Sequence, residues 1–190
     1  MSSIRSTQRH APLAASSTIA RGASSLVRAL AAGAIVAGAS AAMAGPTNVP
    51  FKASVDINEN VAFLFVPPCF AIGTLTGSGT ATHLGKIKGA ALDCINPTAP
   101  ISFNSPMSYA YSSTKVVFTA DNGDMLYLAY AGTLTAQASG PHVIAGHFVI
   151  TGGTSRFVGA SGGGTMSGSE DLSSLGSGTG KASFDGTITY

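Results

Sequence analysis

The stretch from Ile150 to Gly162 constrains the fold of this chain more than any other feature. An apolar run ends at its start and is followed by two glycines that indicate a turn. The dipeptide Arg156-Phe157 comes next, and a second glycine turn leads into another extended run. Glycine turns between extended apolar runs are typical of antiparallel β proteins. The stretch contains no nucleophile, general base or complete metal site, so it indicates a fold and not a chemistry.

A second turn signal lies at Asn122-Gly123, between the runs Thr114–Ala120 and Met125–Thr135. Asn-Gly between two alternating runs is the strongest short-range sign of a β-hairpin. The runs have a period of two, so each strand has one apolar face. His142–Thr151 and Lys181–Tyr190 alternate in the same way. These segments predict strands that are buried on one side.

The remaining strands are predicted at Phe51–Asn58, Val61–Val66, Ile72–Leu84, Lys86–Ile95 and Gly159–Leu172, with a proline-containing loop at Asn96–Pro106. We expect about eight strands in all and no helix, which leaves a sandwich or a closed barrel. Glycines inside the strands favour the barrel, because they suit the bends at which a sheet curls. The fold class is therefore all-β, an antiparallel barrel.

Residues 1–44 are predicted to be a secretory signal peptide. Four arginines precede a short Ala- and Gly-rich apolar run that ends in Ala42-Met43-Ala44, a small-x-small cleavage pattern. A membrane anchor and an organellar transit peptide are the alternatives, but the apolar run is short for a membrane span. The barrel domain is then residues 45–190, and we expect a secreted protein that keeps no membrane span after cleavage.

The charge of the chain depends on this leader. The whole sequence has a net charge of +2, with ten basic and eight acidic residues. The leader contains four of the basic residues and none of the acidic ones, which leaves six basic and eight acidic residues, a net charge of −2. The remaining basic residues are scattered. This pattern excludes a nucleic-acid-binding surface.

Cys69 and Cys94 are the two cysteines of the chain. In an oxidising compartment, two cysteines predict one disulfide. Closing a loop of this length stabilises a protein by roughly 3 kcal/mol in the chain-entropy treatment. Two buried free thiols are the alternative.

The segment Phe148–Gly162 resembles a glycine-rich element shared by allene oxide cyclases and dirigent proteins. Gly79–Lys86 and Asn122-Gly123-Asp124 resemble exported bacterial members of the same barrel superfamily. The resemblance implies an eight-stranded antiparallel barrel of the calycin type, and a homo-oligomer as in the plant members. Ser155 occupies a position where the family commonly has glycine.

The first strand carries the resemblance that bears on chemistry. Val55–Glu59 is similar to a Glu-Ile-Asn-Glu stretch of plant allene oxide cyclases, which implies that Asp56 and Asn58 are catalytic and ligand-binding residues. Strand alternation places both on one face, and that face is the lumen if the register matches. The Ser-Pro that follows in the plant enzymes is absent here. The alternative is that both residues serve a turn at a strand end.

His83 and Tyr127 complete the candidate ligand-binding residues, with a purely structural role as the alternative for His83. His142 and His147 are five residues apart, which puts them on opposite faces of a strand. No Cys, His and Asp pattern has metal-ligand spacing. We therefore expect no metal site and no cofactor.

Together these features predict an exported barrel that binds a small apolar molecule. The resemblance implies a cofactor-free cyclase-like, isomerase-like or dirigent-like activity. The alternative is a non-catalytic envelope or extracellular interaction protein with a filled barrel. A cavity of at least about 300 Å³ lined by Asp56, Asn58 and aromatic residues would favour ligand binding, and a solid lumen would exclude it.

Overall fold

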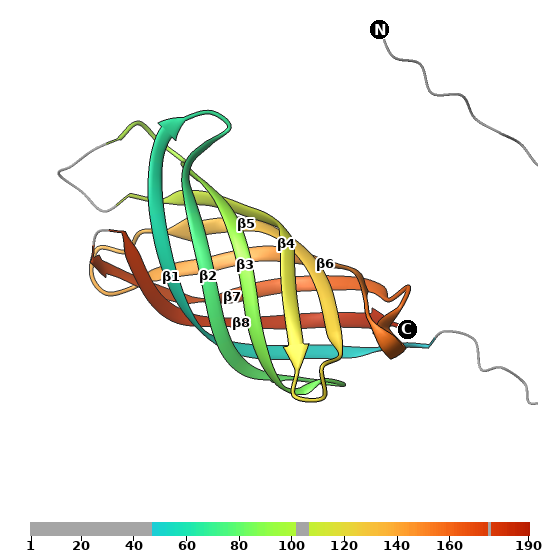
Figure 1. Ribbon diagram of the computed structural model, residues 1–190. Coiled ribbons are helices and arrows are strands. Elements are labelled where there is room, and N and C mark those ends of the chain that lie inside the picture. Colours follow the sequence, from blue (N-terminus) through green and yellow to red (C-terminus); the bar gives the residue numbers. More distant parts are fainter. Residues whose placement is uncertain (1–46, 102–106, 175) are drawn as a thin grey trace, which may run out of the picture. The chain divides into compact units, whose positions relative to one another are not determined.

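The computed structural model describes residues 47–101, 107–174 and 176–190, which form a closed antiparallel barrel (Figure 1). The strands are β1 (Asn48–Val66), β2 (Cys69–Ala81), β3 (Gly85–Pro97), β4 (Tyr109–Ala120), β5 (Met125–Thr135), β6 (His142–Gly153), β7 (Ser161–Ser174) and β8 (Ser177–Thr189), and a short 3-10 turn, η1 (Ser155–Phe157), lies between β6 and β7. The predicted signal peptide, residues 1–44, lies outside the described residues. The prediction of an eight-stranded antiparallel barrel is confirmed.

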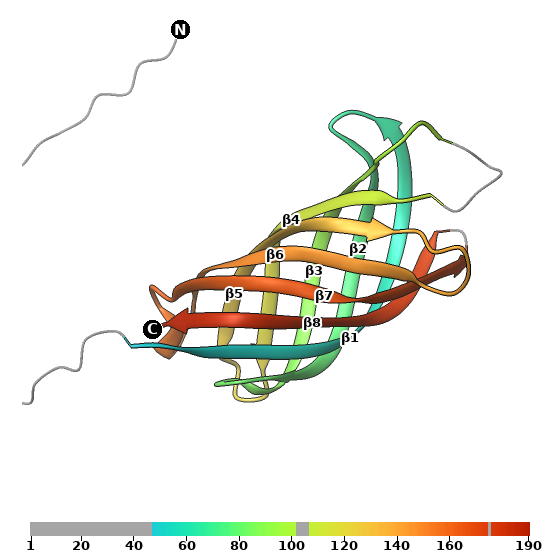
Figure 2. The ribbon, with the colours of Figure 1, turned by 180° about the vertical axis from the view of Figure 1, so that it is seen from behind.

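Each strand pairs with the next, and β1 closes the ring by pairing with β8 (Figure 2). The two strands predicted at Phe51–Asn58 and Val61–Val66 are one strand, β1. Glu59, between them, pairs with Leu75 on one side and Gly178 on the other. Two neighbouring strands satisfy the backbone there, so the polar sequence between the two apolar runs does not end the strand.

The predicted alternation sets the inner face of the barrel. Val116 and Phe118 of β4 and Leu126 and Leu128 of β5 are buried, and a turn at residues 121–124 joins the two strands. The hairpin predicted at Asn122-Gly123 is therefore confirmed. Inward side chains of this kind form the core of a small barrel.

Four buried phenyl rings pack against one another inside the barrel. Phe148 lies 5.7 Å from Phe51 and 5.4 Å from Phe184, measured between ring centroids, and Phe184 lies 5.4 Å from Phe118. These are tilted or edge-to-face contacts, the geometries that aromatic pairs prefer. The four rings form an aromatic layer in the core of the barrel.

The stretch between β6 and β7 covers one end of the barrel. Phe157 of η1 has no exposed surface, and its ring centroid lies 4.9 Å from that of Tyr190 in a tilted contact. The neighbouring Arg156 donates a hydrogen bond to the His83 carbonyl at 2.6 Å and pairs with Asp124 at 3.3 Å. Ser155 has a φ of 51°, in the left-handed region that favours glycine. A glycine would adopt this backbone conformation more readily than Ser155 does.

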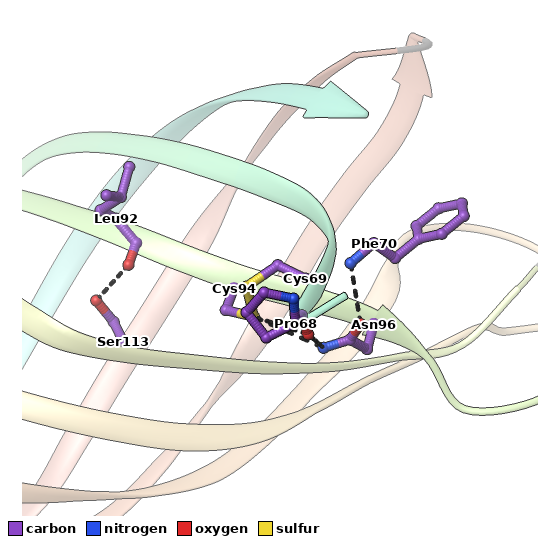
Figure 3. Close-up of a disulfide and its surroundings, with 7 residues drawn as sticks. All are labelled: Pro68, Cys69, Phe70, Leu92, Cys94, Asn96 and Ser113. Atoms are coloured by element: carbon purple, nitrogen blue, oxygen red, sulfur yellow. Dashed lines mark hydrogen bonds between the residues drawn. A yellow bond between two sulfur atoms is a disulfide. The ribbon is translucent and has the colours of Figure 1, made fainter. Parts of the chain in front are cut away.

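The predicted disulfide between Cys69 and Cys94 is present and joins the start of β2 to β3, with the two Cα atoms 5.2 Å apart (Figure 3). Asn96 reinforces the same junction. Its side-chain amide donates to the Pro68 carbonyl at 3.2 Å and its oxygen accepts from the Phe70 amide at 3.0 Å. These contacts anchor the hairpin between β1 and β2, which lies at the end of the barrel opposite η1.

Removing this cross-link in the variant C69S/C94S is expected to lower the free energy of unfolding by about 3 kcal/mol, because the bond closes a loop across a sequence separation of 25 residues. Urea unfolding of the two proteins measures the difference. A reductant should destabilise the natural protein and leave the double variant unchanged. Equal midpoints for the oxidised and reduced natural protein would contradict the prediction.

Candidate functional site

The lumen contains a hollow of about 70 Å³ that is bounded in part by Phe118 and Phe184 of the aromatic layer. Its wall is largely apolar and includes Val55, Ile57, Val116, Phe118, Met166 and Phe184. A second hollow of about 100 Å³ adjoins it on the side of the β1–β2 hairpin and is lined by Val61, Phe63, Phe70 and Leu172, among others. The two hollows share four lining residues, Glu59, Ile95, Tyr109 and Leu134. The lumen is therefore not solid, although each hollow is smaller than the roughly 300 Å³ of a typical ligand pocket.

Three carboxyl groups are buried in this apolar wall. Glu59 of β1, Asp93 of β3 and Glu170 of β7 have only 6%, 5% and 5% of their surface exposed. All three line the first of these hollows, which we call the inner hollow. The Tyr130 hydroxyl donates to Asp93 Oδ1 at 2.7 Å. Burying a charged carboxyl in an apolar wall costs free energy unless the group is paired, hydrogen-bonded or protonated, and such groups cluster at functional sites. The three acids therefore mark the candidate site.

The sheet is irregular beside Asp93. The pairing of β3 with β4 is interrupted between Ala91 and Cys94, and the buried Ser113 hydroxyl donates to the Leu92 carbonyl at 2.7 Å (Figure 3). A bulge of this kind leaves backbone groups without ladder partners, and such bulges are common next to functional sites. Ser113 satisfies one of them.

Burial keeps protons on these acids. Desolvation, reinforced by the charge of Glu170 and a hydrogen bond to it, raises the pKa of Glu59 from its ordinary 4.5 to about 8. Desolvation also raises the pKa of Asp93 from 3.8 to about 7, although the hydrogen bond from Tyr130 opposes the shift. The pKa of Glu170 is raised by burial as well, while its bond with Glu59 acts in the other direction. Near neutral pH, Glu59 therefore holds a proton and donates it in a hydrogen bond to Glu170.

Two polar atoms of the cluster have no partner. Among the described residues, the Tyr111 hydroxyl and Glu170 Oε1 are buried without a hydrogen bond. An unpaired buried oxygen costs about 1–3 kcal/mol. The cavity wall thus presents an acceptor, Glu170 Oε1, and a hydroxyl that can donate or accept.

Two glycines make room for the acids. A Cβ atom at Gly73 would overlap the carboxyl of Glu59, and one at Gly178 would overlap the carboxyl of Glu170. Each glycine lies on a strand next to that of its acid: Gly73 on β2 beside β1, and Gly178 on β8 beside β7. Side chains as small as alanine at these positions would displace the acids.

The residues predicted from the first strand lie elsewhere. Asp56 and Asn58 share one face, as alternation predicts, but it is the outer face of the barrel. The Asp56 side chain is 71% exposed and pairs with Lys181 at 3.4 Å. The expectation that they face the lumen is wrong, because the register of β1 turns Val55, Ile57 and Glu59 inward instead.

The other two candidates also lie outside the hollows. His83 sits in the turn between β2 and β3, at the end covered by η1, with its Nε2 atom 2.9 Å from the Pro50 carbonyl oxygen. This contact fits the structural alternative. Tyr127 alternates with the buried Leu126 and Leu128 and so points outward. The lumen tyrosines are Tyr109, Tyr111 and Tyr130.

One sequence signal could have revealed the acids. Glu59, Asp93 and Glu170 each continue the inward parity of their strand, two residues after an inward-facing residue. A carboxyl at an inward position interrupts an apolar face, and that interruption is visible in the sequence. The residues implied by the family resemblance, Asp56 and Asn58, lie three and one positions before Glu59 and on the opposite face of β1.

The fold and the site define a class of protein: a closed eight-stranded antiparallel barrel with a mainly apolar lumen and buried carboxyl groups in its wall. No known family model, curated protein sequence or solved structure matches the chain. In the described ranges, no three or more His, Cys, Asp or Glu side chains are grouped so that they could hold a metal ion. Those ranges also contain no helix that is long and apolar enough to cross a membrane.

Proposed function

We propose that this protein is an exported barrel that binds a small, mainly apolar molecule in its lumen. The observation that carries the proposal is the apolar hollow with three buried carboxyl groups in its wall. Phe157 and the phenyl rings cover one end of the lumen, and the second hollow provides an approach from the other. The leader-like sequence of residues 1–44 and the disulfide support export.

The hollows favour a compact ligand. About 70 Å³ is several times the roughly 10–15 Å³ that one water molecule requires. We therefore expect a ligand of roughly five to ten non-hydrogen atoms in the inner hollow, with any longer part extending toward Phe63 and Phe70. A filled barrel that acts only through its outer surface would have no use for three buried acids.

A cofactor-free isomerase-like activity is the second candidate. It is supported by Glu59 and Glu170, which share a proton beside an apolar hollow, with the pKa of Glu59 raised to about 8. General acid–base catalysis works best when the pKa of the catalytic group is near the working pH. The resemblance to allene oxide cyclases and dirigent proteins implies the same kind of activity, although it assigns the role to Asp56 and Asn58, and the carboxyl of this strand that lines the lumen is Glu59.

The variant Ala91→Leu tests the binding proposal, because Ala91 lines the inner hollow and a leucine would fill it. We expect native mass spectrometry of the natural protein, purified from its own host, to show a bound small molecule, and Ala91→Leu to lose at least nine-tenths of it. The matched control is Ala145→Leu, on the outer face of β6. Equal occupancy in the two variants would place the ligand outside the lumen and contradict the proposal.

A further inference from the structure

We propose that the ligand carries a protonated amine, which binds among Glu59, Asp93 and Glu170 while its apolar part fills the inner hollow. This inference rests on the proposed function, since it assigns a chemical class to the lumen ligand. It identifies the carboxyl cluster as the recognition site for a cationic head group.

The hydrogen-bonding groups of the cavity match an ammonium. An ammonium donates three hydrogen bonds and accepts none. Glu170 Oε1 is a buried acceptor without a partner, and the Tyr111 hydroxyl is also unpaired. An ammonium can donate a hydrogen bond to each of these oxygens. Its bond to the Glu170 carboxylate would be charge-assisted and therefore stronger than a bond between neutral groups. The ligand would satisfy the two oxygens that the barrel leaves unpaired.

The charges of the cavity also select a cation. The residues that line the two hollows include three acids and no Lys, Arg or His. The basic side chains of the described residues are all exposed: Lys52, Lys86, Lys88, Lys115, Arg156 and Lys181. An anionic ligand would meet buried carboxyl groups without a counter-charge, which costs several kcal/mol. The lumen therefore excludes carboxylates and phosphates.

Tyrosine rings add a second attraction for a cation. Tyr111 and Tyr130 lie 5.7 Å apart between ring centroids in an edge-to-face contact, and both line the inner hollow with Tyr109. The face of an aromatic ring attracts organic cations. A metal ion would instead need several oxygen ligands in one coordination sphere. Within the described residues, these acids do not form a group that could hold a metal ion.

Binding of such a ligand depends on pH in a defined direction. Five ionisable groups face Glu170 and its surroundings across the lumen, namely Glu59, Asp93, Tyr109, Tyr111 and Tyr130. A protonated carboxyl forms no ion pair with an ammonium, so tight binding of the amine requires the cluster to release a proton. The affinity for the amine should therefore rise as the pH rises from 6 to 8. This range includes the pKa of Asp93, about 7, and reaches that of Glu59, about 8. A neutral ligand of the same shape should show no such increase.

Three probes of equal chain length test the inference: hexylamine, 1-hexanol and hexanoate. Isothermal titration of the protein purified from its own host, after exhaustive dialysis, measures their affinities at pH 6 and pH 8. We expect hexylamine to bind about tenfold or more tightly than 1-hexanol at pH 8, a preference that shrinks at pH 6. Hexanoate should be the weakest of the three at both pH values.

Variants assign the preference to the cluster. Glu170→Gln keeps the size of the side chain and removes the charge, so the ratio of hexylamine to 1-hexanol affinity should fall at least fivefold. Glu59→Gln, measured in parallel, should lower the same ratio and keeps the test informative if Glu170→Gln folds poorly. The control is Asp185→Asn, which removes an exposed carboxylate on β8 that pairs with Lys52 at 2.6 Å. It should leave the ratio unchanged.

The outcomes separate the two proposals. If 1-hexanol binds as tightly as hexylamine and Ala91→Leu abolishes both, the lumen site stands and the ammonium inference is wrong. If hexylamine is preferred equally by the natural protein and both glutamine variants, the amine binds outside the cluster and the inference is also wrong. If none of the three probes binds, the lumen-binding proposal itself fails.

Discussion

The free energy of unfolding of this barrel is expected to fall by at least about 3 kcal/mol as the pH rises from 5 to 8. Burial raises the pKa of Glu59 from 4.5 to about 8 and that of Asp93 from 3.8 to about 7. Between the unfolded and folded pKa values, the folded protein holds protons that the unfolded chain has released. Each such carboxyl lowers stability by up to roughly 1.4 kcal/mol per pH unit. Their stabilising contribution is complete below the unfolded pKa values and is lost as the pH rises through the folded ones.

Urea unfolding at pH 5, 6, 7 and 8 measures this slope. Glu59→Gln cannot ionise, so we expect a shallower decline and a higher stability than the natural protein at pH 8. Asp185→Asn removes a carboxylate that is 65% exposed, and its slope should match that of the natural protein. A stability that is flat or rises over this range would show that the lumen acids are ionised in the folded barrel.

Phe157→Ala is expected to lower the free energy of unfolding by about 3–5 kcal/mol. The ring has no exposed surface and packs against Tyr190 at the end of the barrel covered by η1. Truncating a buried phenylalanine removes its transfer free energy and leaves a cavity that the rigid barrel end fills poorly. Guanidinium unfolding measures the loss.

The neighbouring Val158 provides the control for this substitution, because its side chain is 73% exposed. Val158→Ala should change stability by less than about 0.5 kcal/mol. Phe157→Leu keeps much of the apolar volume and should cost less than Phe157→Ala. Equal stability of Phe157→Ala and Val158→Ala would mean that the η1 segment does not close the barrel end.

The fold could be predicted from the sequence because strand alternation and turn chemistry are local. The Asn122-Gly123 hairpin and the inward faces of β4 and β5 follow from residues that are close together in the sequence. The disulfide could be predicted because the chain has two cysteines and therefore one possible pairing. The continuity of β1 through Glu59 and Asn60 could not be predicted in this way. It depends on the strands β2 and β8, which pair with that segment from both sides.

The site was harder to predict, because it depends on register. A shift of one residue exchanges the two faces of a strand. The resemblance of Val55–Glu59 to a family motif transferred residue types without the register, so it selected Asp56 and Asn58 and passed over Glu59. Asp93 and Glu170 lie on β3 and β7, which are each separated from β1 by a single strand, β2 or β8. Glu170 comes near Glu59 only because β8 pairs with β1 and closes the ring, and no local pattern in the sequence predicts that pairing.

The match of Gly73 to Glu59 and of Gly178 to Glu170 has a consequence for how this sequence can diverge. A side chain at either glycine would overlap the carboxyl on the adjacent strand, so that carboxyl would have to turn away from its present place. The two glycine–glutamate pairs therefore couple the sequences of adjacent strands at the lumen wall, and this coupling is separate from the glycine turns at the strand ends. A related barrel that has gained a side chain at position 73 or 178 should hold the matching carboxyl in a different place, and its lumen should recognise a different ligand.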